Sequence, residues 1–220
     1  MPTALITGGT GGLGLSVVEA FRAAGWRAVV TYIVEGDQER LPDGVEAVYA
    51  DLSDPGGVDR AVRVAAGDGD APLKAVANLV GGFKAGQPVA DTPLSEFEVM
   101  LELNLRPTYL VTQAALPRLV AAGGGAIVCV SSKAAFEPWA GGSGYAASKA
   151  AVAAFARAVA KEHADEGVRC NVISPTMIDT PANRASNPDA KMTPPEQVAS
   201  LIRFLCSDES AALNGAVVPV

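Results

Sequence analysis

Short apolar runs alternate along the chain with longer, alanine-rich segments in which apolar positions recur at helical spacing. The apolar runs are rich in β-branched residues and predict strands at residues 4–7, 27–32, 45–50, 74–79, 125–131, 168–174 and 216–220. The segments between them predict helices at residues 12–24, 55–66, 95–121, 145–166 and 194–206. The third segment fits either one helix or two helices that meet near Asn104.

The predicted strands are apolar on both sides, as in the run Ala-Ile-Val-Cys-Val at residues 126–130. Such strands are typical of a parallel sheet with both faces covered. Because strands and helices alternate from end to end, we expect an α/β protein with a doubly wound parallel sheet of about seven strands and helices on both faces. No linker, internal repeat or low-complexity tract interrupts this pattern, so residues 1–220 are expected to form a single domain.

Local signals refine this picture at helix starts and in loops. Thr193 with Glu196, and Ser95 with Glu98, have the spacing of a capping box and predict helix starts there. Residues 81–92 and 175–192 lack periodicity, and each segment follows a predicted strand end. Ligands bind at that edge of a doubly wound sheet, so we expect both loops to border a binding site.

Composition and charge restrict the partners of the chain. It has 17 basic and 24 acidic residues and a net charge of −7, which disfavours nucleic acid and an anionic membrane surface. No apolar run is long enough to cross a bilayer. The three cysteines are widely spaced and no secretory segment is recognised, so a reducing, cytoplasmic location is expected. The single histidine, His163, argues against a histidine-based metal site.

The first predicted strand leads directly into a glycine-rich turn, which a predicted helix follows. The turn fits G-x-G-x-x-G through Gly9, Gly11 and Gly14, and T-G-x-x-x-G-x-G through Thr7, Gly8, Gly12 and Gly14. Missing side chains let backbone N–H groups approach a pyrophosphate, and the helix N-terminus adds favourable partial charge. The alternative is a tight turn that binds no ligand, but the strand–turn–helix context favours a dinucleotide site.

The residues after the second strand bear on the choice between NAD and NADP. That strand ends at Tyr32, and Ile33, Val34 and Glu35 follow, so Glu35 is the nearest acid. An acidic residue in this region binds the ribose 2′-hydroxyl of NAD, whereas an arginine accepts the 2′-phosphate of NADP. Because no cation adjoins the strand end and the net charge is negative, NAD is favoured over NADP.

Tyr145 and Lys149 are four residues apart at the start of a predicted helix, so they project from one face. A neighbouring ammonium favours the phenolate and is expected to lower the pKa of the phenol toward the range of a general acid–base. Ser132 follows a strand, where its hydroxyl can bind the carbonyl oxygen that Tyr145 protonates. A tyrosine and a lysine at this spacing also occur on many surface helices, but the glycine turn and Ser132 favour catalysis.

Together these motifs resemble the short-chain dehydrogenase/reductase family across nearly the whole chain. The similarity rests on the glycine turn, Asp51-Leu52, the strand end Asn78-Leu-Val-Gly81, Asn104, Ser132, Tyr145 and Lys149. It implies a Rossmann fold and an NAD(P)-dependent oxidoreductase that acts on a carbonyl or alcohol. Tyr145 is implied as general acid–base, Lys149 as modulator of its pKa and ligand of the nicotinamide ribose, Ser132 as carbonyl orienter and Asn104 as holder of a relay water.

The resemblance also implies a cofactor site and an assembly. The cofactor-binding residues would be Gly8, Thr10, Gly12, Leu13, Gly14, Tyr32, Asp51, Leu52, Asn78, Gly81, Tyr145, Lys149, Pro175, Ile178 and Thr180. No metal is implied. Helices 95–121 and 145–166 would form the interface of a homodimer or homotetramer.

Some positions depart from the family pattern. Thr176 follows Pro175 where the family has glycine, and Val80 replaces a small alanine. The segment Asp179-Thr-Pro-Ala-Asn183-Arg184 is similar to dihydropteridine reductase, which lacks a serine at the position of Ser132. The alternatives are therefore reduction of a quinonoid substrate, as in that reductase, or a non-catalytic NAD(P)-binding sensor.

Overall fold

A seven-stranded parallel sheet forms the centre of the computed structural model, which describes residues 1–220. The strands are β1 (Thr3–Thr7), β2 (Arg27–Tyr32), β3 (Glu46–Tyr49), β4 (Leu73–Asn78), β5 (Gly125–Val130), β6 (Val168–Ser174) and β7 (Val217–Pro219). Their order in the sheet is β3-β2-β1-β4-β5-β6-β7, and all neighbours are parallel. From β1 the strands are added outward on one side as β2 and β3, and from β4 they are added outward on the other side as β5, β6 and β7. This is the doubly wound order of a Rossmann fold, and its topological switch point lies between β1 and β4.

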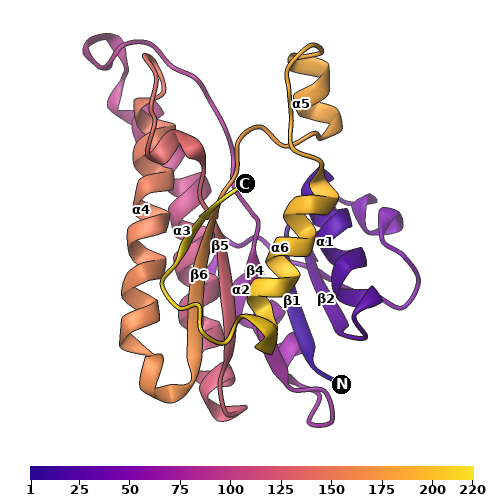
Figure 1. Ribbon diagram of the computed structural model, residues 1–220. Coiled ribbons are helices and arrows are strands. Elements are labelled where there is room, and N and C mark those ends of the chain that lie inside the picture. The colour runs from indigo at the N-terminus through magenta and orange to yellow at the C-terminus, as the bar shows by residue number, and fades with distance from the viewer.

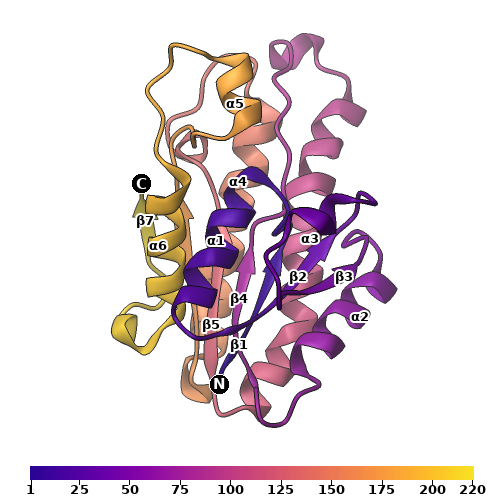
Figure 2. The ribbon, with the colours of Figure 1, turned by 90° about the vertical axis from the view of Figure 1, so that its right-hand side faces the viewer.

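Helices cover both faces of the sheet, as the sequence predicts (Figures 1 and 2). They are α1 (Gly12–Ala23), α2 (Pro55–Ala66), α3 (Leu94–Ala121), α4 (Ser143–Glu162), α5 (Pro181–Ser186) and α6 (Pro195–Cys206). Helices α2, α3 and α4 pack on one face, and α1 and α6 pack on the other. The short α5 stands apart from both layers, beyond the edge of the sheet.

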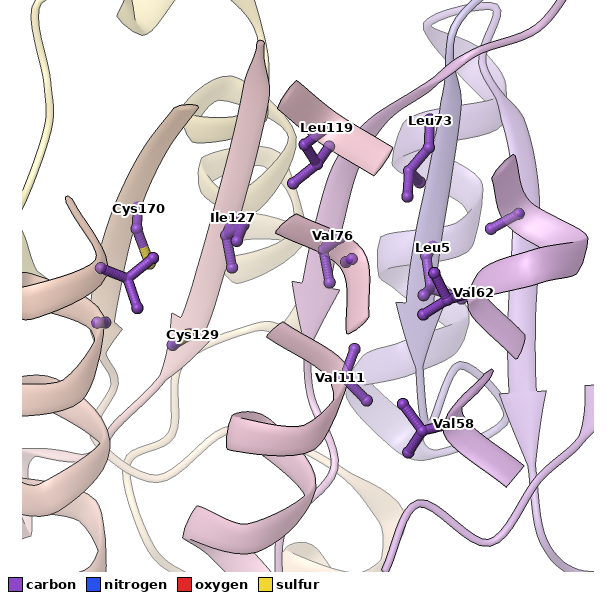
Figure 3. Packing of buried hydrophobic residues seen from close by; sticks show 14 of the residues in the cluster. Leu5, Val58, Val62, Leu73, Val76, Val111, Leu119, Ile127, Cys129 and Cys170 are labelled. Carbon is purple, nitrogen blue, oxygen red and sulfur yellow. The ribbon is translucent and has the colours of Figure 1, made fainter. Parts of the chain in front are cut away.

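Alternation along the strands produces two separate cores. In β1, Leu5 faces the layer of α2, α3 and α4, whereas Ile6 faces α1 and α6. Figure 3 shows the first core, in which Leu5 and Ile127 of the sheet face side chains of the covering helices, such as Val62. All these side chains are buried, so the apolar character of the strands on both sides stabilises both layers at once.

The structure decides one alternative that the sequence left open, and it differs from the sequence-based expectations at the two capping boxes and at α5. The third predicted helix is a single helix, α3, which continues through Pro107 and Pro117. Neither predicted capping box forms, because α3 begins at Leu94 and α6 begins at Pro195, with no side-chain cap at either start. The hydroxyl of Thr193 instead pairs with that of Thr176 at 3.0 Å. Helix α5 lies inside the segment that was expected to be a loop. No helix has the length and apolar character needed to cross a membrane.

Candidate active site

A cleft of about 520 Å³ opens at the carboxyl ends of β1, β2 and β4, at the switch point of the sheet. Among the predicted cofactor residues, its lining includes Gly8, Thr10, Gly12, Leu13, Gly14, Tyr32, Asp51, Leu52 and Gly81. These residues are far apart in the sequence, and the parallel topology brings them to one edge. The cleft therefore has the position at which doubly wound sheets bind ligands.

The glycine turn between β1 and α1 is fixed by its own backbone contacts. Gly8 has φ +64°, and its N–H donates to Oγ1 of Thr31 at 3.1 Å. A Cβ at Gly14 would lie 2.3 Å from the carbonyl oxygen of Gly8, so only glycine fits there. No side chain caps the start of α1, and its first turn contains no acid. The turn and its lining thus fit the pyrophosphate of a dinucleotide, because the first N–H groups of the helix are free to donate.

The far end of the cleft differs from the sequence-based expectation in its acidic residue. Glu35 does not line the cleft, whereas Asp37 does, at the start of a short 3-10 helix, Asp37–Arg40. Tyr32 lines the cleft as predicted and packs edge-on against Tyr49. Asp51 accepts hydrogen bonds from the N–H and hydroxyl of Ser53, and these bonds lower the pKa of its carboxyl group. Asp37 and Asp51 are therefore the acids that line this end of the cleft.

Ser132, Tyr145 and Lys149 converge at the carboxyl end of β5 and the start of α4. Ser132 follows β5, and its hydroxyl accepts from the N–H of Ala134 at 3.2 Å. The preceding residue, Ser131, donates to the carbonyl oxygen of Lys149 at 2.8 Å and so ties the strand end to α4. Burial raises the pKa of Tyr145, and the Ser132 side chain acts in the opposite direction.

Lys149 is buried beside the phenol. Its side chain is only 6% exposed, and Nζ lies 5.9 Å from the centre of the Tyr145 ring. Nζ donates to the carbonyl oxygen of Val130 at 3.0 Å, and burial lowers the pKa of Lys149 to about 8. The expected lowering of the Tyr145 pKa is not found, because desolvation of the phenol outweighs the stabilising contacts in its surroundings. The phenol is therefore held in its protonated form at neutral pH.

Asn104 joins the cleft to this cluster. Its amide donates to the carbonyl oxygen of Gly82 (3.0 Å) and to Oγ of Ser148 (3.1 Å), and its oxygen accepts from the N–H of Gly82 (3.1 Å). A Cβ at Gly81 would lie 2.5 Å from Oδ1 of Asn104 and 3.0 Å from Nζ of Lys149. The structure thus brings the predicted Asn104, Lys149 and Gly81 into direct proximity.

Four predicted cofactor residues do not line the cleft, and their polar groups form hydrogen bonds within the protein. The Asn78 side chain is buried and donates to Thr112 in the core, away from the cleft. The carbonyl oxygen of Pro175 accepts from the N–H of Lys133, and Ile178 and Thr180 organise the start of α5. Thr180 also approaches the glycine turn, because a Cβ at Gly12 would lie 2.8 Å from Cβ of Thr180.

Two aromatic residues beside the candidate acid were not singled out from the sequence, although one of them, Phe83, lies in the loop 81–92 that was expected to border a binding site. Phe83 and Trp139 both pack near the ring of Tyr145, from segments before α3 and before α4. Aromatic residues make up only 5% of the chain, so their occurrence in two loops that follow strand ends was the available signal. Asp37 carried no such signal, because its place depends on the path of the loop after β2.

Residues 2–191 match the short chain dehydrogenase family. The chain belongs to this family. Galactitol 2-dehydrogenase from Rhizobium johnstonii is 32% identical, over 99% of this chain and 92% of that protein. The 2-(R)-hydroxypropyl-CoM dehydrogenase from Xanthobacter autotrophicus is 29% identical, over 98% and 95%. A solved structure of a short-chain type dehydrogenase/reductase from Mycobacterium ulcerans has a TM-score of 0.91 and 26% identity, and the match covers 100% of this chain and 88% of that chain.

Membership of the short chain dehydrogenase family confirms the predicted oxidoreductase class. Members of the family act on alcohol or ketone substrates and use NAD or NADP, and the expectation of a nicotinamide cofactor is confirmed at that level. The doubly wound parallel sheet agrees with the Rossmann fold that the family resemblance implies.

Proposed function

We propose that this short chain dehydrogenase interconverts a carbonyl and an alcohol, with Tyr145 as the group that donates and accepts the proton. The observation that carries the proposal is the convergence of Ser132, Tyr145 and Lys149 next to Gly81, which lines the cleft. A nicotinamide cofactor held by the glycine turn would supply or accept the hydride when bound.

The residues divide the proton chemistry between them. In the reductive direction, the substrate carbon gains a hydride, its oxygen takes the proton of Tyr145, and the C=O double bond becomes a single bond. Ser132 orients that oxygen by donating its hydroxyl hydrogen. The raised pKa of Tyr145 keeps the phenol protonated before the reaction, and Lys149, charged below about pH 8, stabilises the phenolate that forms. The Asn104 side chain holds the backbone of Gly82, so any relay water would use other atoms of this residue.

Replacing Tyr145 with phenylalanine tests this role directly. We expect Tyr145→Phe to lower kcat with any carbonyl substrate by about 10²–10⁴-fold, because the proton donor is lost while the ring remains. Cofactor affinity, measured by fluorescence titration, should change less than about twofold, since the glycine turn is untouched. Tyr109→Phe, which removes an exposed phenol on α3, is the matched control. Retained turnover in Tyr145→Phe would refute the assignment.

We also propose that NAD is preferred over NADP, because Asp37 lines the cleft. A carboxylate accepts hydrogen bonds from a ribose 2′-hydroxyl and repels a 2′-phosphate. We expect NADH to bind roughly tenfold more tightly than NADPH in side-by-side titrations. Asp37→Ser should lower the ratio of the NADPH dissociation constant to the NADH dissociation constant, whereas Glu35→Ser should leave this ratio unchanged. Tighter binding of NADPH, or an effect of Glu35 in place of Asp37, would contradict the proposal.

The surface of α3 and α4 supports a further proposal, a homodimer or homotetramer built through these helices. Val99 and Tyr109 of α3 are exposed apolar residues, and the Tyr109 ring packs 5.6 Å from that of Phe155 on α4. Exposed alanines on α4, such as Ala154, allow a second helix to approach closely. A second copy of the chain is the occupant that would cover this face, because homo-oligomers commonly associate through self-complementary patches.

A further inference from the structure

Three aromatic rings meet at the candidate proton donor. Phe83 lies 5.1 Å from Tyr145 between ring centres, at an interplanar angle of 86°. Trp139 lies 6.3 Å from Tyr145 and 6.2 Å from Phe83. Phe83 follows β4 and Trp139 precedes α4, so the two rings come from separate segments of the chain. Phe83 and Trp139 together are called the aromatic wall below.

The aromatic wall is exposed although its rings are large and apolar. Phe83 is 63% exposed and Trp139 is 46% exposed, whereas the core of the molecule buries its large apolar side chains completely. Leaving such rings in water forgoes the stabilisation that burial gives, so the aromatic wall contributes less to the stability of the fold than a buried pair of the same size would.

Backbone contacts hold the aromatic wall in place. The residue before Phe83, Gly82, exchanges two hydrogen bonds with the Asn104 amide. The Trp139 ring packs on Gly142, where a Cβ would lie 2.8 Å from the indole. The two segments are also tied to each other, because the N–H of Gly86 donates to the carbonyl oxygen of Gly141 at 2.8 Å. The backbone segments that carry the two rings are therefore tied to each other and to α3.

Two lysines on the surface near the aromatic wall form ion pairs with glutamates. Lys84, next to Phe83, forms an ion pair with Glu96 at 3.2 Å. Lys133, next to Ser132, forms one with Glu137 at 2.9 Å. A substrate that meets this surface therefore encounters aromatic faces and two paired lysines, which favours an uncharged molecule, while the ammonium of Lys149 lies deeper, buried beside the phenol.

From these observations we propose that the aromatic wall selects a flat, uncharged, conjugated carbonyl compound, such as an aryl ketone or aryl aldehyde. Its ring stacks on Phe83 and Trp139 while its oxygen meets Tyr145 and Ser132. Stacking geometry of this kind stabilises aromatic ligands beyond the burial of area alone, and a saturated ring of the same size gains less. The inference rests on the proposed function and names the substrate class for the same site.

The test compares acetophenone with cyclohexyl methyl ketone, which carry the same carbonyl on an aromatic and a saturated ring. We expect Phe83→Ala and Trp139→Ala each to lower the ratio of kcat/KM for the aromatic over the saturated ketone by roughly 3- to 10-fold. The conservative variants Phe83→Tyr and Trp139→Phe should keep the ratio within about twofold. Phe136→Ala, which removes an exposed phenylalanine that is not part of the wall, should leave it unchanged.

A second measurement does not depend on turnover. The chain has two tryptophans, and Trp26 packs against Phe21, so Trp26→Phe leaves Trp139 as the sole indole. In the Tyr145→Phe background with NAD⁺ present, 1-phenylethanol should quench this fluorescence at lower concentration than 1-cyclohexylethanol. If 1-phenylethanol quenches Trp139 selectively but the wild type turns over no carbonyl compound, the proposed function is overturned and selective binding at the aromatic wall is supported. The wild type could instead turn over ketones while Phe83→Ala and Trp139→Ala leave the kcat/KM ratio unchanged and neither alcohol quenches selectively. That result would overturn the proposed role of the aromatic wall and leave the proposed function standing.

Discussion

The buried ammonium of Lys149 destabilises the fold at neutral pH, and the proposed function gives it a role in the chemistry of the site. Burial lowers its pKa from 10.5 to about 8, a penalty on the order of 3 kcal/mol. We predict that Lys149→Met, similar in length but uncharged, raises the free energy of unfolding by about 2 kcal/mol at pH 7 while it abolishes turnover. The gain falls short of the full penalty because the hydrogen bond to Val130 is lost.

The pH dependence of this stability difference gives the sharper measurement. The folded-state pKa of Lys149 lies below the unfolded one, so the penalty is fully present below about pH 8 and is relieved as pH rises toward 10.5. Urea unfolding at several pH values should show the two proteins becoming more alike across that window. Lys74→Met is the control, because Lys74 donates to two carbonyl groups at the other end of the sheet, and its loss should only destabilise. A Lys149→Met variant less stable than wild type at pH 7 would contradict the prediction.

At the residue scale, the sequence predicted which side chains meet but not their electrostatics. The spacing of Tyr145 and Lys149 requires only a helix, so their proximity could be predicted. The direction of the Tyr145 pKa shift depends on how deeply the phenol is buried and on its contact with the Ser132 side chain. Both are set by tertiary packing. The place of Asp37 likewise depends on a loop path that no periodicity encodes.

At the scale of elements, the strand–turn–helix unit of β1 and α1 depends on the close approach of two backbones. A Cβ at Gly14 would lie 2.3 Å from the Gly8 carbonyl oxygen, so Gly14→Ala forces the turn open. We predict a loss of about 1–3 kcal/mol in the free energy of unfolding, measured in urea, and weaker binding of NADH. Gly69→Ala is the control, since a Cβ there meets nothing within 4 Å, and it should change stability by less than about 0.5 kcal/mol. Equal effects of both substitutions would show that the turn tolerates a side chain.

Elements with strong apolar periodicity could be predicted, and those defined by local polar contacts could not. All seven strands and the five long helices follow from the spacing of apolar residues along the sequence. The capping boxes failed because proline residues precede α3 and α6 and set both helix starts. Helix α5 has six residues and no buried face, so periodicity could not reveal it; Thr180 caps it through the N–H of Asn183.

At the scale of the whole molecule, the topology explains why distant motifs form one site. The parallel order places the ends of β1, β4 and β5 on the same edge, with the glycine turn, Gly81 and Ser132 following them. The sequence could predict this convergence because strand alternation indicates a doubly wound sheet. The proposed assembly is a separate matter, since the residues proposed to form its interface lie on the outer face of α3 and α4.

Tyr109 is the residue through which that assembly can be tested. It is exposed on α3 and packs against Phe155 of α4, and a second copy would bury both rings. We predict that light scattering after size exclusion gives the wild type two or four times the chain mass of 22.4 kDa. Tyr109→Glu should shift it toward the single-chain mass, because the interface would have to bury an unpaired carboxylate. Val89→Glu, at an exposed apolar residue outside both helices, should not shift it. A wild type at the single-chain mass would refute the assembly, and an oligomer unaffected by Tyr109→Glu would place its interface on another face.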